Sequence, residues 1–325
     1  MKKKLFLAVC VIMMSMTASA LTINKAMLVH NGEVTLYDGD KIQDAVNAAS
    51  DGDAIYLTLG TFKPFNITKR ITIRGVGDTS IIDGNVTISI PGSPKLTSPV
   101  MEALAVSGTV NVGSQVNDMV LRKCKIGNFG INAQVDGAVL DRCYVTNTLT
   151  LSSSIKGMTV VNSKLNAVQA QPSATQNTTF VNCNICKLYT ANFSATIINS
   201  IVQSASAVEY TTTVLNSSVI LNSLINTYYR SSSYPFSIGS SSVTQNCYSE
   251  SKNVLIISST NCECAYDTST LQSKGYLGSD GTVVGIYGGE TPFTLVPSVP
   301  TVTSSDLKLD NENKQLNVKL TVSPQ

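Results

Sequence analysis

The chain has 325 residues, a formal net charge of +2 at pH 7 and only 14% charged residues. Three of its 23 basic residues fall within the first four positions, so the chain without its first 20 residues has 20 basic residues against 21 acidic ones. This near-neutral balance argues against a nucleic-acid-binding surface, which needs a clear excess of Lys and Arg. The abundance of uncharged polar side chains is more typical of an exported solenoid than of a cytosolic enzyme.

Residues 1–20 have the features of a secretory signal peptide. Lysines at the start precede an apolar run over residues 5–14, and residues 18–20 read Ala-Ser-Ala, a typical cleavage site. A lipoprotein anchor at Cys10 is the alternative, but Val9 precedes this cysteine where a small residue would be expected. No other stretch approaches the roughly 20 apolar residues of a membrane span. We therefore expect export to the periplasm, the cell surface or the extracellular space, with no transmembrane segment in the mature chain.

Residues 21–53 are predicted to form an N-terminal segment that ends in a cap helix. Ile42, Ala45, Val46 and Ala49 follow helical spacing, and the residues after them are typical of a strand. An amphipathic helix across the open end of a solenoid would bury its first core layer and protect its free strand edge.

A short pattern recurs seven times in the middle of the chain. It consists of an apolar residue, any residue, usually Asn, then Cys or Ser, any residue and a second apolar position. The seven copies span residues 121–126, 140–145, 160–165, 180–185, 197–202, 220–225 and 244–249. Their Cys or Ser positions lie 17 to 24 residues apart, which indicates a solenoid with one coil per repeat and loops of varying length. We expect the coils to occupy residues 54–265.

The residue types also predict how each coil turns. The β-branched residues around the pattern favour strands of about three to five residues. Because the faces of a strand alternate, the first apolar residue and the Cys or Ser can both face inward only if a bend separates them. Asn is suited to this bend, since it tolerates the left-handed conformation and its amide can bond to the Asn of the next coil. Lys123 and Arg142 take the Asn position in the first two repeats, which puts the bend in doubt there.

This arrangement resembles the right-handed parallel β-helix of the pectin-lyase-like superfamily, with its Asn turn and its inward file of small residues. The opening segment, from the predicted helix through residues 54–57 to residues 71–75 and 81–84, resembles the start of those proteins. Residues 280–289 resemble the closing segment of secreted bacterial β-helix proteins of the Bacteroides type. The resemblance implies an all-β fold, a right-handed parallel β-helix with an N-terminal capping helix, and no particular reaction.

Two loops and the C-terminal part interrupt or end the pattern. Residues 91–99 either wall a cleft or form a plain insertion, and residues 228–242 form a longer loop between coils. Residues 266–325 are predicted to be a C-terminal cap or tail, in which residues 307–309 and 316–320 form a β-hairpin. The hairpin either covers the lower end of the coils or docks onto the sheet of a surface protein partner.

His30 is the only histidine, so a His-dependent nucleophilic mechanism or a His-rich zinc site would have to use it. It lies ahead of the cap helix, and we expect a structural role. Cys124, Cys143, Cys183 and Cys247 belong to the inward file and are expected to be free thiols that pack as small apolar groups.

Two pairs of cysteines remain to be considered as metal ligands. Cys183 and Cys186 form a C-x-x-C motif, and Cys262 and Cys264 follow after the last repeat. We expect three or four coils between the two pairs, about 15 to 19 Å at the usual strand spacing. One metal ion cannot bridge that distance, so the sequence implies no metal site and no cofactor.

Enzymes of the superfamily that the chain resembles generally need acidic residues stacked on neighbouring coils, to hold Ca²⁺ or to act as an acid–base pair. The resemblance places the substrate on the strands that follow the inward Cys or Ser. Those stretches contain one carboxylate, Glu209, so that Glu209, Lys187 and Arg230 are the only plausible catalytic set. Asp118 and Asp141 are expected at solvated corners.

The same stretches are rich in Gln and Tyr, which can bond to sugar hydroxyls and stack on sugar rings. The candidate ligand-binding residues are Gln134, Gln169, Gln171, Tyr189, Tyr210, Tyr228, Tyr229 and Tyr234. A polar solenoid face without any ligand is the alternative interpretation.

Three hypotheses remain open on the sequence alone. The first is an exported, non-catalytic β-helix that binds a polysaccharide or a surface partner. The second is a polysaccharide lyase or glycoside hydrolase that uses the weak catalytic set. The third is a structural or adhesive surface protein.

Overall fold

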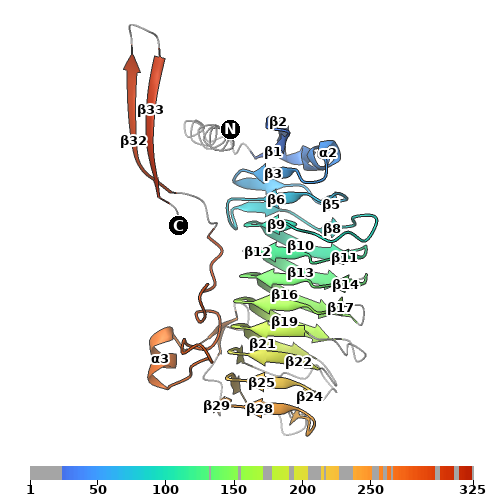
Figure 1. Cartoon of the computed structure of the whole chain (residues 1–325), viewed down its shortest axis with the longest axis vertical. Coiled ribbons are helices and arrows are strands. Elements are labelled where there is room, and N and C mark those ends of the chain that lie inside the picture. The colour runs from blue at the N-terminus through green and yellow to red at the C-terminus, as the bar shows by residue number, and fades with distance from the viewer. Residues whose placement is uncertain are drawn as a thin grey trace.

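The computed structural model describes residues 24–131, 133–152, 155–170, 178–189, 194–203, 214–215, 217–226, 237–250, 256–258, 262–264, 266–296, 301–310 and 315–323. These residues form a parallel β-solenoid whose coils stack along one axis (Figure 1). The prediction of an all-β fold built from parallel coils is confirmed. In the described part of the chain, no helix has the length and apolar character needed to cross a membrane.

Two long sheets, A and B, and a short sheet C form the faces of the solenoid. Sheet A contains, in spatial order, β2 (Glu33–Asp38), β1 (Lys25–His30), β3 (Ala54–Leu57), β6 (Thr72–Arg74), β9 (Met101–Glu102), β12 (Val120–Arg122), β15 (Val139–Asp141), β18 (Thr159–Val161), β20 (Thr178–Val181), β22 (Ala195–Ile198), β25 (Val219–Leu221) and β28 (Val243–Gln245).

Sheet B contains β4 (Gly60–Phe62), β7 (Ser80–Ile82), β10 (Ala105–Val112), β13 (Lys125–Ile131), β16 (Tyr144–Leu151), β19 (Lys164–Ala170), β21 (Asn184–Tyr189), β23 (Ile201–Val202), β26 (Leu224–Asn226) and β29 (Tyr248–Glu250), with β5 (Phe65–Ile67) and β8 (Val86–Ile88) joined to it beside β10. Sheet C contains β11 (Val116–Asn117), β14 (Val135–Asp136) and β17 (Ile155–Lys156). Three further pairs are β24 (Val214–Leu215) with β27 (Ser237–Ile238), β30 (Ile256–Ser258) with β31 (Glu263–Cys264), and β32 (Thr301–Asp310) with β33 (Gln315–Ser323).

A short helix closes the N-terminal end of the solenoid, as predicted. The 3-10 turn η1 (Gly39–Lys41) leads into α2 (Ile42–Ala48), which Figure 1 shows at the end of the stack beside β1 and β3. Ile42, Ala45 and Val46 are fully buried and belong to the same apolar core as the first coils. The helix thus covers the first core layer, which would otherwise face water.

The coil interior is built from apolar residues that stack in register. Leu121, Leu140, Val160, Phe180, Ile197 and Ile220 pair one with the next along sheet A and have no exposed surface. The predicted stacking of these residues from coil to coil is confirmed.

Each sheet A strand from β9 to β28 is followed by a residue with left-handed backbone geometry. The Asn positions of the repeat have φ between 44° and 52° (Asn162, Asn182, Asn199, Asn222 and Asn246). Lys123 and Arg142 adopt the same conformation, with φ of 52° and 54°. The bend is therefore kept where the sequence put it in doubt, because the turn from sheet A to sheet B has this geometry in every coil from β9 onward.

The residue after the bend turns inward, and its side chain links neighbouring coils. The Ser200 hydroxyl accepts from the backbone N–H of Cys183 at 3.0 Å and donates to its own strand at Ile198 O at 2.7 Å. Ser163 and Ser223 repeat this arrangement on their coils. The thiols of Cys143, Cys183 and Cys247 donate to a carbonyl of the previous coil, as Cys183 does to Val160 O at 3.2 Å. Buried polar groups in the file are thus hydrogen-bonded, as stability demands.

The prediction that the Asn amides of neighbouring coils bond to one another is wrong for Asn162 and Asn199. Asn162 donates instead to Gly288 O at 2.8 Å, and Asn199 accepts from the backbone N–H of Ser279 at 3.0 Å. Both partners lie in residues 278–296, a segment that runs along the bend from the coil of Asn199 to that of Lys123, whose Nζ donates to Val296 O at 2.9 Å. We call residues 278–296 the strap.

The segment between the coils and the strap covers an apolar patch on sheet B. The outward position just after the inward Cys or Ser holds Ile201 and Leu224 on β23 and β26, and these pack with Leu271 of α3 (Thr268–Ser273) and with Val283 and Val284. The strap passes so close to the coils that a Cβ at Gly285 would collide with Ile201 and the Asn184 amide. Gly285 also has φ of 86°, so both the space and the backbone require glycine there.

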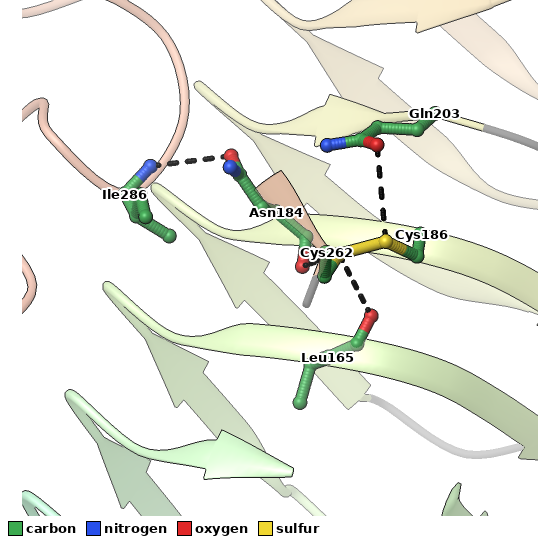
Figure 2. The surroundings of a disulfide bond; sticks show 6 residues. All are labelled: Leu165, Asn184, Cys186, Gln203, Cys262 and Ile286. Atoms are coloured by element: carbon green, nitrogen blue, oxygen red, sulfur yellow. Dashed lines mark hydrogen bonds between the residues drawn. A yellow bond between two sulfur atoms is a disulfide. The ribbon is translucent and has the colours of Figure 1, made fainter. Parts of the chain in front are cut away.

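A disulfide joins Cys186 of β21 to Cys262, with the two Cα atoms 5.2 Å apart (Figure 2). The Cys262 sulfur lies 3.3 Å from Leu165 O, so Cys262 sits beside β19 and β21 and not three or four coils further on. The predicted separation of the two cysteine pairs is therefore wrong. Cys124, Cys143 and Cys183 are free thiols, as predicted.

The predicted C-terminal hairpin is present as the antiparallel pair of β32 and β33. Figure 1 shows it well away from the last coil of β28 and β29. The signal peptide predicted for residues 1–20 lies outside the described residues.

Replacement of Asn182 by Leu should lower the free energy of unfolding. A left-handed Leu costs about 1 to 2 kcal/mol, and at this position the larger side chain must also displace Gly289, whose backbone lies against the Asn182 amide. Asn246 has the same backbone geometry, with φ of 50°, and is exposed. Thermal unfolding of Asn246→Leu therefore measures the strain alone, and Asn182→Leu should unfold at a lower temperature than this control. Equal melting temperatures for the two variants would show that the strap adds nothing at the bend.

Thiol titration tests the cysteine assignment. In denaturant without reductant, the chain lacking residues 1–20 should show five reactive thiols, those of Cys124, Cys143, Cys183, Cys247 and Cys264. Reduction should raise the number to seven, the full cysteine content of that chain. Seven thiols before reduction would contradict the Cys186–Cys262 bond.

Candidate functional site

The outer face of sheet B carries a continuous column of uncharged, mostly polar residues. Strand pairing aligns one outward position on six neighbouring coils, occupied by Thr87, Asn111, Gly130, Thr150, Gln169 and Tyr189. The residues beside this column, such as Val110, Leu149 and Val168, are fully buried. The alternation fixes which residues face outward, because successive side chains of a strand lie on opposite faces.

A second outward column lies next to the first on the same strands. It contains Thr148, Ala167 and Lys187, which pair in this order on β16, β19 and β21. The five strands β10, β13, β16, β19 and β21 contain no Asp or Glu. These strands therefore offer hydroxyl and amide groups and the ammonium groups of Lys125, Lys164 and Lys187, but no carboxylate.

The structure brings together three of the residues singled out from the sequence. Gln169 is exposed and pairs directly with Tyr189, and Lys187 lies two residues before Tyr189 on the same face. Gln134 is also exposed, but it lies between β13 and β14, off sheet B. The other candidates lie outside the described residues, namely Gln171, Glu209, Tyr210, Tyr228, Tyr229, Arg230 and Tyr234.

The strap borders this face on the side of the bend. Lys164, which follows the inward Ser163, has its Nζ 5.7 Å from the ring centre of Tyr144 and 5.1 Å from that of Phe293 in the strap. Such contacts between an ammonium group and aromatic rings are attractive. They hold one edge of the face in place and leave the two polar columns beyond it.

Two carboxylates on sheet A pair with arginines. Arg74 contacts Glu102 at 2.7 Å, and Asp141 accepts from Arg122 at 2.8 Å and from Arg142 at 2.9 Å. Burial alone would raise the pKa of Asp141, but the hydrogen bonds from Arg142 and Arg122 outweigh it and hold the pKa below its ordinary value of 3.8. These carboxylates form ion pairs on sheet A, whereas the polar columns lie on sheet B. They are therefore poorly placed to act on a ligand bound to sheet B.

The loop of residues 91–99 walls a hollow at the N-terminal part of the solenoid. The hollow has a volume of about 270 Å³, and Asp51, Arg70, Lys95, Thr97 and Ser98 are among its lining residues. Its charged groups pair with one another or with neighbours, Arg70 with Asp51 at 2.8 Å and Lys95 with Asp118 at 3.0 Å. The loop thus walls a cleft, and the sequence left that alternative open.

His30 and the cysteines have structural environments. The Nδ1 atom of His30 lies 2.9 Å from Asp53, and Asn31 contacts its Nε2 atom at 2.9 Å. Burial raises the pKa of the Cys183 thiol to about 12, and burial also raises that of Cys143, so neither is a thiolate at neutral pH. Within the described ranges, no three His, Cys, Asp or Glu side chains gather as a metal-binding group.

The sequence did not single out Thr87, Asn111, Gly130 and Thr150 as parts of a face. Each belongs to a strand with alternating apolar residues, and this alternation was a usable signal. The register that aligns them depends on irregularities in the pairing of sheet B, between Val106 and Thr109 for example. Such shifts are not visible in the sequence.

Comparison of the chain with protein-family models, with curated proteins and with solved structures finds no match. The arrangement of the residues therefore carries the functional argument by itself.

The ion pairs around Asp141 predict a dependence of stability on pH. At neutral pH, Asp141→Asn should lower the free energy of unfolding by about 1 to 3 kcal/mol, because Arg122 and Arg142 lose their charged acceptor. The pKa of Asp141 is lower in the folded protein than in the unfolded chain. Its contribution is therefore complete above the unfolded value and is lost as the pH falls through the folded value.

Thermal unfolding of wild type and Asp141→Asn measures this dependence. The difference in Tm should stay constant from neutral pH to about pH 5 and shrink below it. A difference that widens on acidification would contradict the assignment.

Proposed function

We propose that this protein is an exported, non-catalytic β-solenoid that binds an uncharged polysaccharide along the outer face of sheet B. The observation that carries the proposal is the column from Thr87 to Tyr189, in which six neighbouring coils present one outward position in register. Adjacent coils are spaced by about 4.8 Å, close to the length of one sugar unit in an extended chain. A linear glycan can therefore meet an equivalent position on coil after coil.

The chemistry of the face supports a sugar ligand. Amide and hydroxyl side chains donate to and accept from sugar hydroxyls, and few charges need to be stripped of water when the ligand binds. Gly130 in the middle of the column leaves space for the ligand to approach the backbone. Gln169 is an exposed member of the column and is well placed to reach a ligand.

Binding without cleavage is the part of the proposal that separates it from an enzyme. Hydrolysis of a glycosidic bond requires two carboxyl groups, and a Ca²⁺-assisted lyase requires several acidic oxygens around the ion. The strands β10 to β21 of sheet B supply neither. Lys187 lies on the face and favours one alternative, a metal-free lyase in which its amine takes up a proton.

One further feature supports export of the protein, and another supports its relation to a known superfamily. The Cys186–Cys262 disulfide is typical of an oxidising compartment, which agrees with the signal peptide expected at residues 1–20. The Asn bend and the inward small residues support right-handed winding and a distant relation to the pectin-lyase-like superfamily.

Two glutamine variants test the binding face. Isothermal titration calorimetry of the full chain with soluble glucan, xylan and galactomannan should show binding of at least one of them. Gln169→Ala should weaken that binding by about 2- to 10-fold, the effect of one lost hydrogen bond. Gln134→Ala is the matched control, since Gln134 is also exposed but lies off sheet B, and it should bind as wild type does. Equal effects of the two substitutions, or binding that neither changes, would place the glycan elsewhere.

A further inference from the structure

The lower part of sheet A has an outer face without charges. The strands β18, β20, β22, β25 and β28 contain no Asp, Glu, Lys or Arg. Their register aligns Val161, Val181, Ile198 and Leu221 in one outward column, directly below the paired charges of Arg122 and Asp141. We call these four residues the apolar column.

The apolar column remains partly accessible to water. All four of its residues are partly exposed, and the neighbouring outward positions Val219 and Val243 are 37% and 56% exposed. The equivalent positions of sheet B that are apolar, Ile201 and Leu224, are covered by the segment that contains α3. A contiguous exposed apolar surface of this kind commonly marks a site of protein association.

The C-terminal hairpin has the complementary pattern. The register pairs Leu309 with Leu316 and Leu307 with Val318, so these residues occupy alternate positions that belong to one face. Lys308 and Asn317 pair on the opposite face. The hairpin forms a two-stranded sheet of its own, and an isolated hairpin in water is at best marginally stable. It therefore needs a surface to cover its apolar face.

The dimensions of the two surfaces agree. Residues 316–322 of β33 span about 20 Å, and the five strands from β18 to β28 span about 19 Å across the sheet. A hairpin that lies along the solenoid axis would cross the sheet A strands at nearly a right angle, one of the two common packing modes of sheets.

The course of the strap carries the hairpin away from the apolar column of its own chain. The strap runs from the coil of Asn199 back to that of Lys123, which holds Val296 O. Figure 1 shows the hairpin beyond this point, on the N-terminal side and clear of the lower coils. We propose that the hairpin docks on the apolar column of a second copy of the chain, so that two copies exchange their hairpins.

Adjacent hairpin residues on opposite faces provide the test. Light scattering and sedimentation of the full chain should show a dimer. Val318→Asp places a charge on the apolar face and should weaken dimerisation by at least about tenfold, because a buried, unpaired carboxylate is costly. Asn317→Asp adds the same charge one residue away on the other face and should leave the dimer intact. A monomeric wild type, or a dimer that survives Val318→Asp, would overturn the proposal.

A mixing experiment separates exchange between copies from other modes of association. Ile198→Asp damages the apolar column and should also give a monomer. A mixture of Ile198→Asp and Val318→Asp should associate again, because the first variant retains its hairpin and the second retains its apolar column. Failure of the mixture to associate, with both variants folded by circular dichroism, would contradict docking of the hairpin on sheet A. If Ile198→Asp does not fold, the comparison of Val318→Asp with Asn317→Asp still tests whether the apolar face of the hairpin forms the dimer contact.

Discussion

The repeating coils depend on one left-handed residue directly after each sheet A strand from β9 to β28. Without this bend the apolar residue of sheet A and the small residue that follows could not both face the core. The conformation persists at Lys123 and Arg142, which are not Asn, with φ of 52° and 54°. The left-handed conformation costs about 1 to 2 kcal/mol for each such residue, and the packing of the coil offsets this cost. Asn reduces the cost in the later repeats.

The bend also separates the outer surfaces into faces of different chemistry. Sheet A has paired charges on its upper coils, from Arg74 to Asp141, and an apolar column below them. Sheet B has hydroxyl and amide groups on its middle coils, and an apolar patch on its lower coils that the segment containing α3 covers. Because the core is the same throughout, these outer positions are free to vary without loss of the fold. The functional proposals rest on them for this reason.

The sequence predicted the repeating parts well, because periodicity is a direct consequence of stacking. The cap helix at Ile42, the inward file at Ser163 and Cys183, and the hairpin at residues 307–320 all followed from local patterns. The two errors arose where partners come from distant parts of the chain. The Asn162 amide bonds to Gly288 and not to a stacked Asn, and Cys262 returns to the coil of Cys186. No period links these residues, so spacing could not place them together.

The candidate site was only partly predictable for a similar reason. Gln169, Lys187 and Tyr189 were found because their chemistry suits a sugar, and their strands bring them onto one face. Gln134 has the same chemistry but lies beyond the end of its strand. The side chains of Thr87 and Asn111 are common polar ones that do not by themselves indicate a binding site. Only the register between coils shows that they belong to one surface.

The proposed binding of a glycan without cleavage is tested by prolonged incubation of the protein with a broad panel of polysaccharides. Each mixture is followed in parallel by affinity electrophoresis, by absorbance of unsaturated products and by the appearance of new reducing ends. We expect retarded migration on at least one uncharged polysaccharide, with no product of either kind. Unsaturated products or new reducing ends that accumulate with time would contradict it and identify the protein as an enzyme.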